Sequence, residues 1–160
     1  MSAEFCRPTS VLSNQDLGAD YRLLRLRSPR IAATAVPGQF VHVRVPALDP
    51  SALRRPISVC DADPDTGVLT LLFRMVGRGT IALATVREGD EVDLMGPLGN
   101  GFPLPPDGSS VLLVGGGYGV APLHFLARSI LRARTATGSS SSSFERSNLR
   151  TFEPSNRDTP

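Results

Sequence analysis

The 160 residues of this chain suffice for one domain and a fragment of a second, and a hydrophobic content of 41% is typical of a globular protein. A net charge of +2 without a basic run excludes a nucleic-acid-binding surface, and no apolar run approaches the roughly 20 residues of a membrane span. The sequence opens without the apolar segment of a secretion signal, so we expect a cytoplasmic protein with no membrane or nucleic-acid partner.

The first hundred residues carry the pattern of short strands separated by turns. Apolar and polar residues alternate most clearly in two stretches. The apolar positions in these stretches are Val41, Val43, Val45, Leu69, Leu71, Phe73 and Met75. Further strands are predicted at residues 21–28, 54–62 and around 92–94, with turn clusters of Gly, Pro and Asp between them. This spacing predicts a mainly β domain over residues 1–103, an antiparallel barrel of the Greek-key type, with a short helix at 77–86.

The pattern changes over residues 104–134. Residues 111–114 form a continuous apolar run, as expected of a strand covered on both faces, and the pattern is helical from Gly119 onward. The predicted apolar face of this helix contains Val120, Leu123, Leu126 or Ala127, Ile130 and Leu131, while Arg128, Arg132 and Arg134 are predicted to project outward. This segment therefore predicts the first strand–helix unit of an α/β domain, which needs several such units.

Few other residues suggest chemistry of their own. Cys6 and Cys60 stand far apart without a CxxC motif or a His/Cys cluster, so we expect two idle thiols and no metal site. His124 is expected to be a packed or half-exposed helix residue. The alternating carboxylates Asp61, Asp63 and Asp65 are expected to form a solvated loop in preference to a calcium site.

A glycine-rich turn stands between the predicted strand at 111–114 and the helix that follows. Glycines Gly115, Gly117 and Gly119 allow the backbone to approach a phosphate, which the N–H groups of a helix N-terminus can bind. Pro122 falls in the first helical turn, where its missing N–H costs nothing. A tight turn without a ligand is the alternative.

Two further stretches hold residues suited to phosphate binding. Arg55 precedes Pro56 in an extended segment and can grip a diphosphate with two N–H groups, and the hydroxyl of Ser58 can reach a polar ring atom. The alternative here is an edge strand with solvated arginines. At residues 77–80, two glycines allow a tight turn and Thr80 can cap the helix that follows, which predicts a second anion site.

The ordered set of motifs PGQF, RRPIS, FRMVGRGT, GPLGNGF and LLVGGGYGVAP resembles the ferredoxin-reductase-like flavoproteins. Such proteins join an FAD-binding β-barrel to a nicotinamide-binding α/β domain. Within that superfamily, LRRPIS together with GPLGNGF is similar to the family of electron transfer subunits of dihydroorotate dehydrogenase B. The resemblance covers roughly residues 5–134.

The resemblance implies an FAD site and the start of an NAD site. Arg55 would bind the diphosphate of FAD, Ser58 would lie near the flavin ring, and Gly79 and Thr80 would bind the diphosphate from the helix start. The other residues implied for FAD are Pro56, Ile57, Phe73, Arg74 and Met75. Those implied for NAD are Gly115, Gly116, Gly117, Gly119, Ala121 and Pro122. No catalytic residue is implied, because the redox chemistry belongs to the cofactors.

The family also implies a role in pyrimidine biosynthesis. In it, electrons pass between NAD and the FMN of a catalytic dihydroorotate dehydrogenase subunit, through FAD and a 2Fe-2S cluster. The resemblance thus implies an oxidoreductase subunit for electron transport, with that FMN subunit as its partner in a hetero-tetramer.

The sequence departs from this family after residue 134. The closely spaced cysteines of a 2Fe-2S cluster are absent, further α/β units are absent, and residues 135–160 contain a run of five serines that predicts a disordered tail. We therefore expect a truncated chain, through a frameshift or a broken gene model, which retains FAD binding, has an incomplete NAD site and is inactive as an enzyme alone. Residues 111–134 are then expected to be protease-sensitive. Two alternatives remain: a reductase subunit of another ferredoxin-reductase-like complex, and a non-catalytic flavin-binding fragment.

Overall fold

The computed structural model describes residues 7–45, 53–106 and 108–136 of the chain. The strands in these ranges are β1 (Arg7–Gly18), β2 (Tyr21–Arg27), β3 (Phe40–Arg44), β4 (Arg55–Asp63), β5 (Val68–Arg74) and β6 (Glu91–Leu98). The helices are α1 (Pro29–Thr34), α2 (Arg78–Ala84) and α3 (Val120–Ala136), with a short 3-10 turn, η1 (Gly117–Gly119), before α3.

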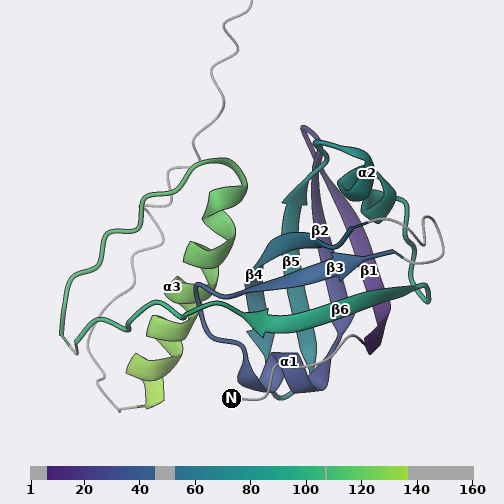
Figure 1. Cartoon of the computed structure of the whole chain (residues 1–160). Helices are drawn as coiled ribbons and strands as arrows, with labels where there is room; N and C mark the ends of the chain where they lie inside the picture. The colour runs from purple at the N-terminus through teal and green to yellow at the C-terminus, as the bar shows by residue number, and fades with distance from the viewer. Residues whose placement is uncertain (1–6, 46–52, 107, 137–160) are drawn as a thin grey trace, which may run out of the picture.

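The strands close into a barrel in the order β1-β2-β5-β4-β3-β6 (Figure 1). All neighbouring pairs are antiparallel. β3, β4 and β5 follow one another as a meander, and β6 returns to pair with β3, which is the Greek-key arrangement. The predicted mainly β, antiparallel barrel is confirmed.

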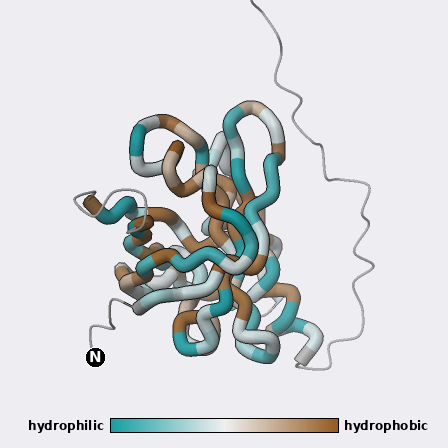
Figure 2. The backbone as a smooth tube through the Cα atoms, turned by 90° about the vertical axis from the view of Figure 1, so that its right-hand side faces the viewer, coloured by the Kyte–Doolittle hydropathy of each residue, from teal (hydrophilic) through white to brown (hydrophobic). Residues whose placement is uncertain are grey.

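The interior of the barrel is filled by the alternating apolar residues. Val41, Val43 and Val45 are at most 8% exposed, and Leu69 and Leu71 are fully buried, as the alternation predicts. Figure 2 shows hydrophobic and hydrophilic residues mixed along the tube of the barrel, as strands with one buried face require. Because closure leaves no free sheet edge, all six strands contribute to one core.

Two short helices cover opposite ends of the barrel (Figure 1). α1 adds Ile31 to the core and α2 adds Leu83. The α2 end is tied to β1 by Asn14, whose Nδ2 donates to the carbonyl oxygens of Leu83, Ala84 and Val86 at 3.1, 3.2 and 3.0 Å. The sequence predicted α2 but neither β1 nor α1. β1 is interrupted by two irregularities in its register with β2, which blur the alternation, and α1 has only six residues.

α3 lies along the side of the barrel against β4 (Figure 1). The helix begins one residue after its predicted start, but the predicted apolar face is partly wrong: Val120 and Leu131 are 43% and 45% exposed. The buried residues are Ala121, Phe125, Leu126 and Ile130. The difference arises because the helix packs on the convex outside of a barrel, where only a narrow stripe is covered.

The predicted outward positions of Arg128 and Arg132 on α3 are confirmed, since both residues are exposed, but each also reaches β4 with its guanidinium group. Arg128 Nη1 lies 2.9 Å from Asp61 Oδ2, and Arg132 Nη1 donates to the carbonyl oxygen of Ala62 at 3.2 Å. Both contacts reach β4, so the polar edge of the helix also contributes to its docking on the barrel. Asp61 accordingly belongs to this interface and not to a solvated loop.

Residues 111–114 do not form the predicted strand. They have no ladder partner among the described residues, and Leu112 and Val114 are 87% and 81% exposed. A strand needs a neighbour for its backbone N–H and C=O groups, and the barrel is already closed. α3 continues to Ala136; residues 137–160 of the predicted disordered tail lie outside the described residues.

Candidate functional site

The first cluster of predicted site residues joins the start of β4 to the start of α2. Arg55, half-buried, opens β4, and its side chain lies directly against Gly79 in the first turn of α2. A Cβ at position 79 would overlap Arg55 Nε and lie 3.0 and 3.1 Å from Cγ and Cζ. The Arg55 side chain can therefore lie where it does only because residue 79 has no side chain. The structure brings these two predicted residues together.

Thr80 shapes the same helix start from a different position than predicted. The N-cap is Gly77, and Thr80 is the third residue of the helix. Its Oγ1 accepts from the amides of Val76 and Gly77 at 3.0 and 3.2 Å and donates to the Gly77 carbonyl at 3.0 Å. The hydroxyl thus caps the helix start as the third residue of a capping box, which confirms the predicted cap role of Thr80, although glycine occupies the N-cap itself.

The charges in this cluster point to an anion. The side chain of Arg55 has neither a hydrogen-bond nor an ion-pair partner in the part of the chain that the structure describes. It lies beside the N-terminus of α2, where the first-turn N–H groups have no intrahelical acceptor and carry partial positive charge. A guanidinium and a helix N-terminus repel each other unless an anion lies between them, and a diphosphate can accept from both. The residues present therefore fit the diphosphate of FAD.

Next to Arg55, two pairs of residues on β3 and β4 form a largely apolar surface with one hydroxyl group, which we call the Phe40 shelf. Its residues are Phe40, His42, Pro56 and Ser58. Ser58 lies opposite Phe40, and Pro56 lies opposite His42. The rings of Phe40 and His42 are 5.6 Å apart between centroids. Such a surface suits one face or edge of a planar ring, with the Ser58 hydroxyl available to a polar ring atom.

The structure places the side chains of two other predicted FAD residues elsewhere. Ile57 and Phe73 are 6% and 3% exposed and lie in the barrel core, so only their backbone can face a ligand. Met75, just beyond β5, packs partly against the same core. Strand alternation explains this, because residues on either side of Ile57 and of Phe73 point outward.

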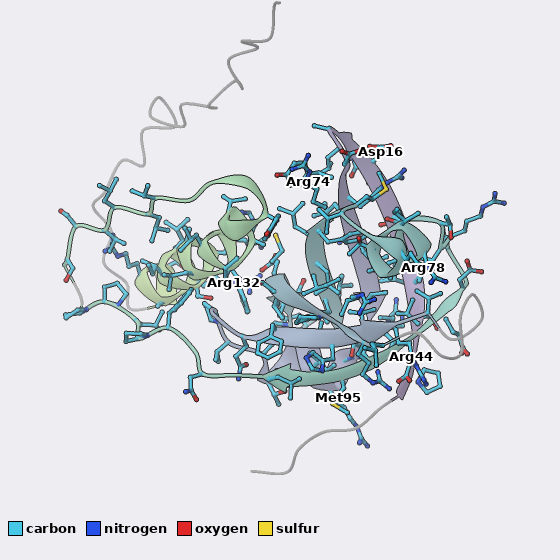
Figure 3. The ribbon with its side chains drawn as sticks, turned by 45° about the horizontal axis from the view of Figure 1, so that its top comes forward. Asp16, Arg44, Arg74, Arg78, Met95 and Arg132 are labelled. Carbon is cyan, nitrogen blue, oxygen red and sulfur yellow. The ribbon has the colours of Figure 1, made fainter. Side chains whose placement is uncertain are left out.

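A second cluster gathers where β2 and β5 meet the glycine turn. The Arg74 guanidinium lies 5.9 Å from the centre of the Tyr21 ring and 3.7 Å from Asp20 Oδ2. Figure 3 shows Arg74 near Asp16, at the tip of the β1–β2 hairpin. The Tyr21 hydroxyl packs against Gly117, where a Cβ would lie 3.1 Å from it. Tyr21, which no sequence motif marks as a site residue, thus connects the barrel to the turn.

The glycine-rich turn leads into α3 as predicted, but no strand directly precedes it in the described part of the chain. Gly115, Gly116, Gly117 and Gly119 are all exposed, and Gly117 has a φ of +55°, which favours glycine. Ala121, the second residue of α3, is fully buried. Pro122 occupies the first turn of α3, as predicted. This turn contacts Tyr21, β5 and the first residues of α3.

Two of the motifs that carry the resemblance hold each other in place. Gln39 of PGQF donates through Nε2 to the carbonyl oxygen of Gly99 in GPLGNGF at 2.9 Å. The amide of Phe102 donates to the carbonyl oxygen of Pro37 at 2.7 Å. A Cβ on Gly99 would meet the Phe40 ring at 3.0 Å. These motifs therefore shape the turn beside the Phe40 shelf.

Arg54, beside Arg55, is paired, which contradicts the alternative of an edge strand with solvated arginines. Arg54 Nη2 binds Asp93 Oδ2 at 2.5 Å, and Arg44 Nη2 binds the same oxygen at 3.0 Å. Asp93 is only 9% exposed. One weak signal for this network is present in the sequence, an aspartate between two core residues, Val92 and Leu94.

The remaining candidates carry no chemistry. Burial raises the pKa of the Cys60 thiol to about 11, with a smaller contribution from the Asp61 carboxylate, which makes it an inert thiol. The Thr66 hydroxyl, above all, lowers the pKa of Asp63, whose Oδ1 accepts from the amide of Asp65 at 3.0 Å. His124 is exposed. Among the described residues, no group of three His, Cys, Asp or Glu could hold a metal ion, and no helix could cross a membrane.

Comparison with known proteins identifies the class. The sequence profile of the oxidoreductase FAD-binding domain matches residues 8–102, more than half of the chain. The chain therefore belongs to this family. The resemblance to ferredoxin-reductase-like flavoproteins is confirmed.

Curated relatives narrow the class to one kind of protein, the electron transfer subunit of dihydroorotate dehydrogenase B (NAD(+)). That of Desulforamulus reducens is 52% identical over 103 residues, which are 64% of this chain and 39% of the relative. That of Bacillus caldolyticus is 53% identical over 98 residues, 60% of this chain and 38% of the relative. That of Shouchella clausii is 43% identical over 124 residues, 76% and 48% of the two chains. The chain thus spans about two-fifths to half of the length of these relatives.

Solved structures agree on the fold. The structure of an NADH-dependent reduced ferredoxin-NADP oxidoreductase matches with a TM-score of 0.72 and 31% identity, over 83% of this chain and 46% of that one. The ferredoxin reductase of carbazole 1,9a-dioxygenase matches with a TM-score of 0.68 and 26% identity, over 80% and 40% of the two chains.

Proposed function

We propose that this chain binds FAD and serves electron transfer as the FAD-binding part of a dihydroorotate dehydrogenase B electron transfer subunit. Membership of the FAD-binding family and the curated relatives support the proposal. The observation that carries it is Arg55, a half-buried guanidinium that lies against the start of α2 with no partner among the described residues. An FAD diphosphate would supply the missing negative charge.

The residues of the chain would bind and orient the cofactor. Arg55 would donate two N–H groups to the diphosphate, and the backbone at Gly79 would approach it closely because no side chain intervenes. Ser58 would direct its hydroxyl to the flavin ring above the Phe40 shelf. Bound FAD supplies the electron chemistry, accepting and releasing electrons while the barrel holds it in place.

The rest of the electron path is part of the same proposal. The glycine turn from Gly115 to Gly119, with Ala121 and Pro122, would contribute to a nicotinamide-nucleotide site at the N-terminus of α3. The partner would be the FMN-containing catalytic subunit that oxidises dihydroorotate, in pyrimidine biosynthesis. These 160 residues hold no cysteine set for a 2Fe-2S cluster.

A titration of the purified chain with FAD, followed by flavin absorbance and fluorescence, tests the proposal. Wild-type chain is expected to bind FAD and turn yellow, and Arg55→Met is expected to weaken FAD binding at least about tenfold, the loss of one charge-assisted contact. Riboflavin, which lacks the diphosphate, serves as the control ligand and should bind both chains equally. A folded chain that ignores FAD refutes the proposal.

A second candidate is a flavin-binding module that transfers no hydride. The observation that favours it is the exposed, unpaired segment 111–114 directly before the glycine turn. Anaerobic addition of NADH to the yellow protein separates the two functions. Bleaching supports hydride transfer in this chain, whereas persistent colour supports the flavin-binding module.

A further inference from the structure

Asp93 is a buried carboxylate on the outside of the barrel wall. It lies on β6, where its neighbours Val92 and Leu94 fill the core and its own side chain points away from it. Its Oδ2 binds both Arg44 and Arg54, and Arg54 Nη1 also donates to its carbonyl oxygen at 3.1 Å. Its Oδ1 is buried without a hydrogen bond in the described ranges.

Arg44 and Arg54 lie at two strand ends that meet beside the proposed diphosphate site at Arg55 and Gly79. Arg44 is the last residue of β3, Arg54 immediately precedes β4, and Val43 pairs with Arg55 in the ladder between these strands. Figure 3 shows Arg44 and Arg78, which opens α2, at the same end of the barrel. Asp93 therefore fixes the position of the β4 start from the third strand, β6.

Stability alone is a weak reason for this network. Burying a carboxylate and two guanidinium groups costs desolvation that their attraction barely offsets, and apolar residues of similar size stabilise such sites equally well. A network of this kind does, however, hold strand ends in one arrangement.

We propose that Asp93 is a positioning residue for FAD. By binding Arg44 and Arg54 it fixes the start of β4, and thereby directs the neighbouring Arg55 guanidinium at the N-terminus of α2. This inference rests on the proposed FAD binding and adds a residue that does not touch the cofactor. Its role is to act through Arg55.

A double-mutant cycle on the dissociation constant of FAD tests this coupling. The variants are Asp93→Asn, Arg55→Met and their combination, with Arg54→Lys as a second probe that keeps the charge and changes the geometry. Asp93→Asn is expected to raise the Kd for FAD about tenfold, the effect of misplacing one charge-assisted contact. In the Arg55→Met background it is expected to change the Kd less than twofold, because the group it positions is already gone. Arg54→Lys should follow the same pattern.

The matched control is Asp61→Asn on β4, the strand that Arg55 opens; it breaks the 2.9 Å ion pair between Asp61 and Arg128 of α3. It is expected to leave the Kd for FAD unchanged, and riboflavin binding should be unchanged in every variant. If Asp93 only stabilises the fold, Asp93→Asn would raise the Kd for FAD and the Kd for riboflavin by the same factor. Alternatively, the fold-change in the FAD Kd of the double variant would equal the product of the fold-changes of Asp93→Asn and Arg55→Met. Either result overturns the inference. If the wild-type chain does not bind FAD, the proposed function fails together with the inference. If it binds FAD but Asp93→Asn behaves as a structural variant, only the inference fails.

Discussion

Gly79→Ala isolates the geometry of the proposed diphosphate site with a single methyl group. The new Cβ would overlap Arg55 Nε and crowd its Cγ and Cζ at 3.0 and 3.1 Å. The backbone at Gly79 is outside the left-handed region, so alanine adopts it without strain. In a helix, alanine is more favourable than glycine by up to about 1 kcal/mol. The variant is therefore expected to be as stable as the wild type, or slightly more stable, while Arg55 is pushed away from the helix start.

The expected loss is that of one hydrogen-bonded contact to a charged group, about 1.5–3 kcal/mol, which corresponds to an increase of about 10- to 150-fold in the Kd for FAD. FAD titrations measure the affinity, and urea unfolding of the apoprotein measures the stability. Gly119→Ala is the matched control, because its Cβ meets nothing within 4 Å and it lies in the glycine turn away from Arg55. An unchanged Kd in Gly79→Ala would refute the reasoning.

Three further predictions concern the fold around the site. Asn14→Ala should lower the free energy of unfolding by about 1–3 kcal/mol, measured in urea, because three carbonyl oxygens at the end of α2 lose their donor. Phe125→Ala removes a buried contact of α3 and should accelerate proteolysis of residues 104–134 while the barrel persists; equal rates for both parts would contradict this. At pH 8, Cys60 in a Cys6→Ser chain should react with a thiol reagent about 100-fold more slowly when folded than in urea, because its pKa rises from 9.0 to about 11 and only the thiolate reacts. Since the folded pKa is the higher one, this thiol stabilises the fold below pH 9, and the contribution is lost as the pH rises through 11.

Residues whose role is local could be predicted from the sequence. Alternation at Val41, Val43 and Val45 fixes which face of β3 enters the core, because the side chains of a strand alternate by geometry alone. Arg55 and Gly79 were each predicted from the chemistry of a short motif, and the structure brings them into contact.

Residues whose role depends on distant partners could not be predicted. Asp93 meets Arg54 39 residues away, and Asn14 meets the end of α2 at a separation of 69 residues or more. No local pattern marks such pairs. The helix face of α3 was misplaced for the same reason, since the helix packs on β4 and not on the sheet that the segment at 111–114 predicted.

The measurement that tests the central claim most directly is the NMR signal of the Arg55 Nε–H group, assigned by comparison with Arg55→Lys. The account predicts that this signal shifts when FAD or ADP is added and stays in place with riboflavin, because the diphosphate is the group that Arg55 binds. A yellow FAD complex in which the Arg55 signal does not move would contradict it.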